Sequence, residues 1–171
     1  GVHTAIGTDP AETTWASNDY VNFVVKAVKP EKYTDKAYFV LTGTAGGFIP
    51  ELSSSEFSEV YSDKNWNFMV SLYPEKYLNA DIIPGTSGSV KGGYTVEFAG
   101  VQSIVDAVIS EFSVTGSMTA DHATKFLASP KRFFAGSHRT NFTGTLITPT
   151  DAKMNNLRVW QNKLDIVDLR K

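Results

Sequence analysis

Carboxyl groups are the first residues to consider for catalysis in this 171-residue sequence, because glycoside hydrolysis uses them in pairs. A retaining enzyme needs the two groups about 5 Å apart. Glu97 and Glu111 fall on separate predicted strands, each at a solvent-facing position of its alternation. Glu51, Glu56 and Glu59 lie around a run of serines that is typical of a loop. No spacing brings two of these carboxylates together, so we predict that none is catalytic.

Hydrolysis through an activated serine or cysteine is the second chemistry to consider. The sequence has no cysteine and three histidines, His3, His122 and His138. Ser137 and His138 are adjacent, so on a strand their side chains would point to opposite faces. The Gly-x-Ser-x-Gly pattern of a nucleophile elbow is absent from the sequence. We therefore predict a protein that is not an enzyme.

Aromatic and amide side chains could instead bind carbohydrate, since rings stack on sugar faces and amides bond to sugar hydroxyls. The candidate ligand-binding residues are Trp15, Tyr61, Tyr77 and Asn141. Trp15 lies in a polar, loop-like stretch, where the favoured alternative is that it packs over the end of a sheet. Trp66 and Trp160 are in phase with neighbouring apolar residues, and we predict that both are structural.

The composition is that of an ordinary soluble globule, with 42% hydrophobic and 20% charged residues and a formal charge of −2. That charge and the absence of a basic cluster exclude nucleic acid and anionic membrane as expected partners. No apolar run approaches the roughly 20 residues that span a bilayer. The lack of cysteine excludes disulfides and thiolate metal sites.

The length suits one domain, covering residues 1–171. No signal peptide follows Gly1, and the sequence stops at Lys171, where a regular element is still under way. We therefore expect a single domain excised from a longer chain.

Short alternating runs between turn residues predict strands along most of the chain. The cleanest run, 65–73, places Trp66 and three further apolar residues on one face and asparagines on the other, and Pro74 closes it. The run 94–98 is expected to stop at Gly100, and the run 106–114 to place Val108 and Phe112 on one side. The other predicted strands are 21–28, 38–41, 131–135, 143–147 and 155–160.

One short helix is predicted over 119–128. Thr119 or Asp121 is its N-cap, and Ala123, Phe126 and Leu127 form its apolar face. With so many strands and so little helix, the sequence predicts an all-β fold made of two antiparallel sheets. A jelly-roll sandwich is the most economical arrangement.

The C-terminal third carries an ordered set of aromatic and glycine motifs. Phe133-Phe134-Ala135-Gly136, Phe142-Thr143-Gly144 and Leu157-Arg158-Val159-Trp160 follow one another, and Leu164 and Val167-Asp168-Leu169 come after them. This set resembles the closing block of laminin-G-like domains in the concanavalin A-like lectin and glucanase superfamily. The run from Lys131 to Gly144 is also similar to laminin-G-like modules carried by phage and other virion structural proteins.

The resemblance bears on the expected sites. Glucanases of this superfamily carry a Glu-x-Asp-x-x-Glu run or a close relative of it on one strand, and this sequence has none. Domains of this kind also bind Ca²⁺ at a loop rim, which would make Asp81, Asp106 and Asp151 the candidate metal ligands. The sequence shows no dense cluster of acidic residues, so we predict no cofactor and keep calcium as the alternative.

Two functions follow from these expectations. The first is a non-catalytic structural or adhesion module of a virion, such as a phage, or of a cell surface, with other protein subunits of an assembly as its partners. The second is a lectin-like module that recognises surface glycans. A glycoside hydrolase is a third alternative, which activity abolished by Glu97→Gln or Glu111→Gln would support.

Overall fold

The computed structural model describes residues 2–4, 23–43, 49–61, 65–75, 93–105, 107–128, 131–133, 137–139, 146–149 and 153–170, which form ten strands and two helices. The strands are β1 (Val2–Thr4), β2 (Phe23–Val28), β3 (Tyr38–Gly43), β4 (Leu52–Ser53), β5 (Trp66–Pro74), β6 (Tyr94–Ile104), β7 (Ala107–Met118), β8 (Lys131–Phe133), β9 (Ser137–Arg139) and β10 (Leu146–Pro149). The helices are α1 (Ala120–Ala128) and the single turn α2 (Ile166–Leu169).

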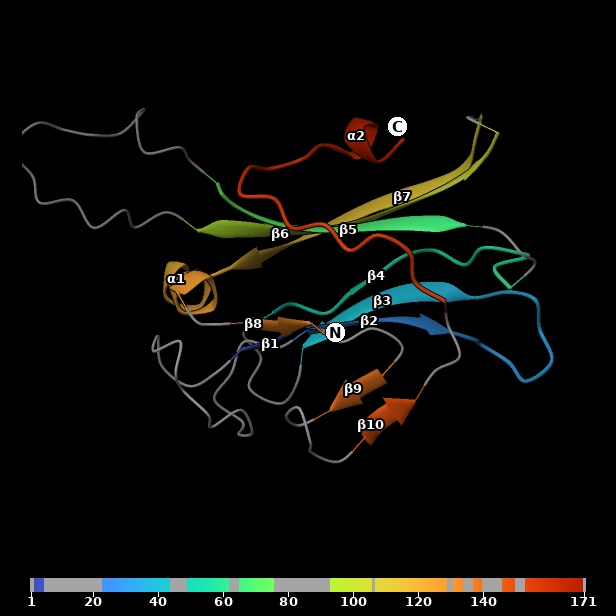
Figure 1. Ribbon diagram of the computed structural model, residues 1–171, viewed down its shortest axis with the longest axis horizontal. Helices are drawn as coiled ribbons and strands as arrows, with labels where there is room; N and C mark the ends of the chain where they lie inside the picture. Colours follow the sequence, from blue (N-terminus) through green and yellow to red (C-terminus); the bar gives the residue numbers. More distant parts are fainter. Residues whose placement is uncertain are drawn as a thin grey trace, which may run out of the picture.

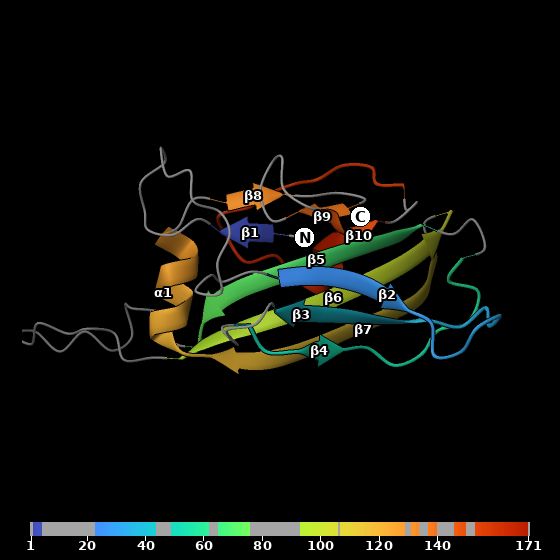
Figure 2. The ribbon, with the colours of Figure 1, turned by 90° about the horizontal axis from the view of Figure 1, so that it is seen from below.

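All of the strand pairs are antiparallel, as predicted. One sheet has the order β4-β3-β2-β1-β8, a second has the order β5-β6-β7, and β9 and β10 form a separate pair. Figures 1 and 2 show the three-stranded sheet lying over the β2–β3–β4 part of the five-stranded sheet. The predicted all-β fold of antiparallel sheets is therefore confirmed.

The hydrophobic core lies between these two sheets. Its buried side chains alternate along the strands that face each other, namely Phe39 and Leu41 on β3, Val96 and Phe98 on β6, and Phe112 on β7. The ring of Phe112 stacks on Phe39 at 5.7 Å and meets Phe98 edge-on at 5.0 Å. Such aromatic pairs are worth about 0.5–1.5 kcal/mol each beyond the area they bury.

The predicted register of β5 is confirmed, and the strand ends at Pro74. Trp66 packs against the core, with its ring 4.6 Å from that of Phe39. On the opposite, outer face, Met69 and Ser71 are also buried. The outer face of this sheet is therefore covered as well.

Two expectations about β6 and β7 are wrong. β6 does not stop at Gly100 but continues to Ile104, because Gly100 lies opposite Phe112 and leaves room for its ring. Val108 does not share the face of Phe112. The register shifts between Gln102 and Ser103, which leaves Ile109 as an extra residue in β7 and turns Val108 to the outer side.

Helix α1 connects β7 to β8 at one end of the two sheets (Figure 1). Thr119 caps it as predicted, since its hydroxyl accepts a hydrogen bond from the backbone N–H of His122 at 3.3 Å. Ala123 is buried, and Phe126 packs 5.9 Å from the ring of Phe23. Leu127 was expected on the apolar face but is 54% exposed.

The predicted strand at 155–160 does not form. Residues 153–165 have no regular structure, and Trp160, expected in the core, is 57% exposed. Figures 1 and 2 show this segment passing the β5 edge before α2 reaches the outer face of the three-stranded sheet. We call residues 153–170 the C-terminal strap. The strap ends in the single helical turn α2, which includes the Val167-Asp168-Leu169 motif.

Candidate functional site

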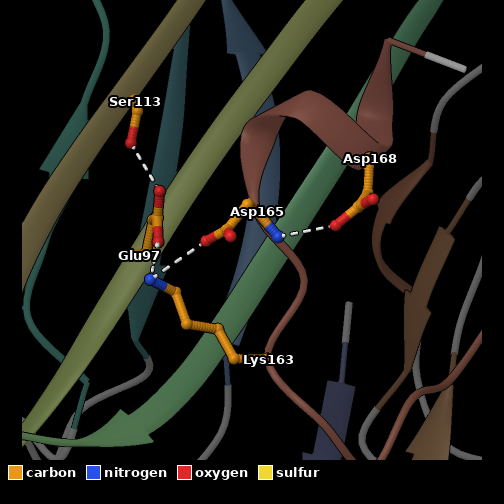
Figure 3. Close-up of polar contacts among 5 residues, drawn as sticks. All are labelled: Glu97, Ser113, Lys163, Asp165 and Asp168. Carbon is orange, nitrogen blue, oxygen red and sulfur yellow. Dashed lines mark hydrogen bonds and ion pairs between the residues drawn. The ribbon is translucent and has the colours of Figure 1, made fainter.

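Within the described part of the chain, a cluster of polar side chains lies on the outer face of β6, under the strap (Figure 3). Glu97 points outward from β6, and Ser113 points outward from the neighbouring strand β7. The Ser113 hydroxyl donates a hydrogen bond of 2.8 Å to Oε1 of Glu97. The other carboxylate oxygen, Oε2, lies 3.8 Å from Nζ of Lys163 in the strap. Both oxygens of this buried carboxylate therefore have polar neighbours.

Lys163 is the cation that joins the strap to this cluster. Its Nζ lies 3.3 Å from Oδ1 of Asp165 and 4.2 Å above the ring centre of Tyr73 on β5. Burial alone would lower the pKa of Lys163. The hydrogen bond that Lys163 donates to Asp165 and the electrostatic interactions with Tyr73, Glu97 and Asp165 outweigh it and raise the pKa above its ordinary value of 10.5. Lys163 is therefore a protonated cation at neutral pH and cannot act there as a base.

The turn that follows fixes the position of Lys163 and Asp165. The backbone N–H of Asp165 donates a 3.1 Å hydrogen bond to Oδ2 of Asp168, and the N–H of Asp168 donates to the backbone oxygen of Asp165 at 2.8 Å. This is the pattern of a capped helix start, and it begins α2 (Figure 3). A carboxylate in the first turn also complements the helix dipole.

A second ion pair joins the end of the strap to the same sheet. The guanidinium of Arg170 donates two hydrogen bonds to Glu111 on β7, at 2.6 and 2.9 Å. Both oxygens of the carboxylate are used, which is the strongest form of this pair. Because both side chains are more than a third exposed, the pair is worth at most about 1 kcal/mol.

The two glutamates do not form an acid–base pair. Glu97 lies opposite Thr115, four residues along β7 from Glu111, so the two backbones are about 13 Å apart along the sheet. Each carboxylate is also occupied by a cation from the strap. Glu97 was expected to face solvent but is buried, because the strap covers the outer face on which it lies. The arrangement suits a structural clamp better than the transfer of a proton.

Of the predicted ligand-binding residues, the structure describes Tyr61, which is half-exposed. Nζ of Lys29 sits 4.2 Å above its ring, and burial raises the pKa of its hydroxyl above the ordinary value of 10.0. A sugar stacking on that face of the ring would have to displace the lysine. Trp15, Tyr77 and Asn141 lie outside the described residues, so their grouping with Tyr61 stays a prediction.

The predicted calcium ligands Asp81, Asp106 and Asp151 also lie outside the described residues. Within the described ranges, no group of three or more histidine, aspartate or glutamate side chains could hold a metal ion. Calcium therefore stays an alternative that the sequence alone supports. No helix in the described part of the chain is long and apolar enough to cross a bilayer.

The sequence reading missed an exposed apolar surface at the turn between β6 and β7, which we call the hairpin tip. Its large side chains are exposed by 39 to 93%, most of all Val105, and comprise Ile104, Val105, Val108 and Ile109. The sequence contains a sign of this surface, because two pairs of consecutive aliphatic residues cannot all face one side of a strand. The sequence pattern does not tell which of the four side chains are exposed.

Nor did the sequence reading assign any role to Lys163 or Arg170. A lysine and an arginine in a polar C-terminal stretch carry no local mark of a partner, and each meets its glutamate only in the folded chain. Comparison with known proteins identifies no relative: no family model, no curated protein and no solved structure matches this chain.

Proposed function

We propose that this chain is a non-catalytic structural or adhesion module that acts through protein–protein contacts, as part of a virion or a cell-surface assembly. In this proposal the facing sheets belong to a jelly-roll sandwich of the laminin-G-like kind. The hairpin tip is the observation that supports the function. Four large aliphatic side chains gathered at one exposed end suggest a surface that a partner covers.

The local charge favours a protein partner over a lipid surface. Residues 101–114 include Asp106 and Glu111 but no lysine or arginine. A loop that inserts into an anionic bilayer gains from basic residues beside its apolar ones. This segment supplies none of its own, and the nearby cation Arg170 is paired with Glu111. Apolar side chains with a few acidic neighbours fit a protein surface that has a pocket and a basic rim.

Photo-crosslinking in the cells that produce the protein tests this function. A photoreactive residue is placed at position 105 in one variant and at position 33 in another. Val105 and Tyr33 are matched, since both are about 90% exposed and both have a positive φ. We expect protein adducts from position 105 and none from position 33.

Equal labelling at the two positions, or no protein adduct at 105, would contradict the proposed function. A glycan array tests the lectin-like alternative. Binding to a defined glycan that Val105→Asp leaves unchanged would support the lectin-like alternative instead.

A further inference from the structure

The C-terminal strap has two parts of opposite character. Every residue from 153 to 162 is exposed, and we call this part the tether. Residues 163–170, the anchor, include α2 and carry both ion pairs to the three-stranded sheet. The strap is thus a docked segment that follows a solvent-exposed connection.

Side-chain contacts join the anchor to the sheet. The backbone hydrogen bonds of the strap join Asp168 to Asp165 and Arg170 to Val167, both within the anchor. The polar contacts with the sheet include Lys163 with Glu97 and Tyr73, and Arg170 with Glu111. None of these contacts depends on which chain supplies the anchor, so a second copy can make all of them.

Charge complementarity selects the surface on which an anchor can dock. The anchor presents two cations, Lys163 and Arg170, and the outer face of the sheet presents Glu97 and Glu111 at the matching positions. The two carboxylates differ in their surroundings, because Glu97 on β6 is buried and Glu111 on β7 is exposed. Another copy of this chain carries the same matching surface.

The tether exposes more apolar surface than a connection needs. Its large apolar residues are all more than half exposed, and they are Met154, Leu157, Val159 and Trp160. Fully extended, its ten residues reach about 35 Å, which is enough to carry the anchor to a neighbouring molecule. Asn156 lies in the left-handed region at φ 57, so the path of the tether turns at this residue.

We propose that two copies of this chain exchange their C-terminal straps. Each anchor docks on the Glu97 and Glu111 face of the other copy, and the two tethers run side by side and bury Leu157, Val159 and Trp160 against each other. The docking contacts are the same in the closed and exchanged forms, so burial of the tethers drives the exchange. This inference goes beyond the proposed function, because it uses the strap rather than the hairpin tip and names a second copy as the partner.

Paired charge reversals test the exchange directly. Glu111→Arg and Arg170→Glu each place like charges at the anchor site of a closed chain. When the two variants are mixed, only an exchanged pair of chains matches opposite charges at both sites. Size-exclusion chromatography with light scattering and native mass spectrometry measure the species, since the two variants differ in mass.

We expect the wild type to form a dimer of twice the single-chain mass, and each single variant to lose most of that dimer. The mixture should recover it as a heterodimer that exceeds either homodimer at least tenfold. The double variant Glu111→Arg/Arg170→Glu, which restores the pair within one chain, should dimerise as the wild type does, and circular dichroism checks that every variant is folded.

A wild type that stays monomeric at all concentrations, or a mixture without preferential heterodimer, would overturn the exchange. Asn156 provides an independent measurement. Asn156→Val disfavours the bend and should raise the dimer fraction, whereas Asn156→Gly favours the bend and should lower it. Val105→Asp should leave the dimer unchanged, so failure of the exchange and failure of the hairpin-tip function give different results.

Discussion

The packing of the core requires the ring of Phe112 to lie close to the backbone of β6 at Gly100. A β-carbon added at Gly100 would overlap the ring of Phe112 and lie 3.1 Å from Cδ1 of Phe68. The same ring stacks on Phe39 and meets Phe98 edge-on, so it has little freedom to move away. Glycine at position 100 is therefore a packing requirement of the aromatic cluster.

Gly100→Ala is expected to destabilise the fold by about 1–3 kcal/mol, because the added methyl group forces Phe112 out of its packed position. The change is measured as a lower denaturation midpoint in urea. Gly93→Ala is the matched control. There the atoms nearest to the new β-carbon belong to the carboxylate end of Glu75, an exposed side chain that can move aside. An unchanged midpoint for Gly100→Ala would show that the ring adapts.

At the scale of elements, the ends of the helices and strands follow from local chemistry. α1 begins where Thr119 accepts the hydrogen bond from His122, and α2 begins at the turn that Asp165 and Asp168 close. β7 bends where the extra residue Ile109 interrupts its ladder with β6. That bend turns apolar side chains outward and helps to create the hairpin tip.

Thr119→Ala is expected to cost about 1 kcal/mol, since the first turn of α1 loses its cap. Thermal or urea unfolding measures the loss. Thr124→Ala in the exposed interior of the same helix is the control, and it should be neutral or stabilise by up to about 0.5 kcal/mol because alanine is the better helix former. Equal effects at the two positions would argue against a cap at Thr119.

At the scale of the whole molecule, the strap ties the C-terminal end to the middle of the chain. It covers an outer sheet face on which Met69, Ala99 and Val101 are buried together with Glu97. The ties are ion pairs and a cation–ring contact, which respond to pH and salt more than apolar packing does. Docking of the strap should therefore be adjustable by solution conditions.

The pH dependence of this docking follows from Lys163. The pKa of Lys163 is raised in the folded chain, so its protonated form stabilises the fold. That contribution is complete below the ordinary value of 10.5 and is lost as the pH rises through the higher folded value. The difference in melting temperature between wild type and Lys163→Met should thus be constant from neutral pH up to about pH 10 and then shrink.

Lys163→Arg is the control for this titration, because arginine keeps its charge throughout that range. Its melting temperature should exceed that of Lys163→Met by the same margin at all pH values. A difference between wild type and Lys163→Met that does not change above pH 10 would show that Lys163 adds nothing to docking.

The sequence by itself determined the elements whose signals are local. The alternation around Trp66 gave the face and register of β5, and Thr119 marked the start of α1, because side-chain period and cap chemistry act within a few residues. The antiparallel all-β class followed from the same signals.

Only the tertiary structure decided what covers each outward face. Glu111 and Arg170 are 59 residues apart in the chain, and no local pattern brings them together. Gly100 is a second case, since it does not end β6 but leaves space for the ring of Phe112 on β7. Trp160 is a third, because its segment has the pattern of a core strand but pairs with no strand among the described residues. An alternating sequence defines the two faces of a strand, but which distant segment packs on each face depends on the tertiary structure.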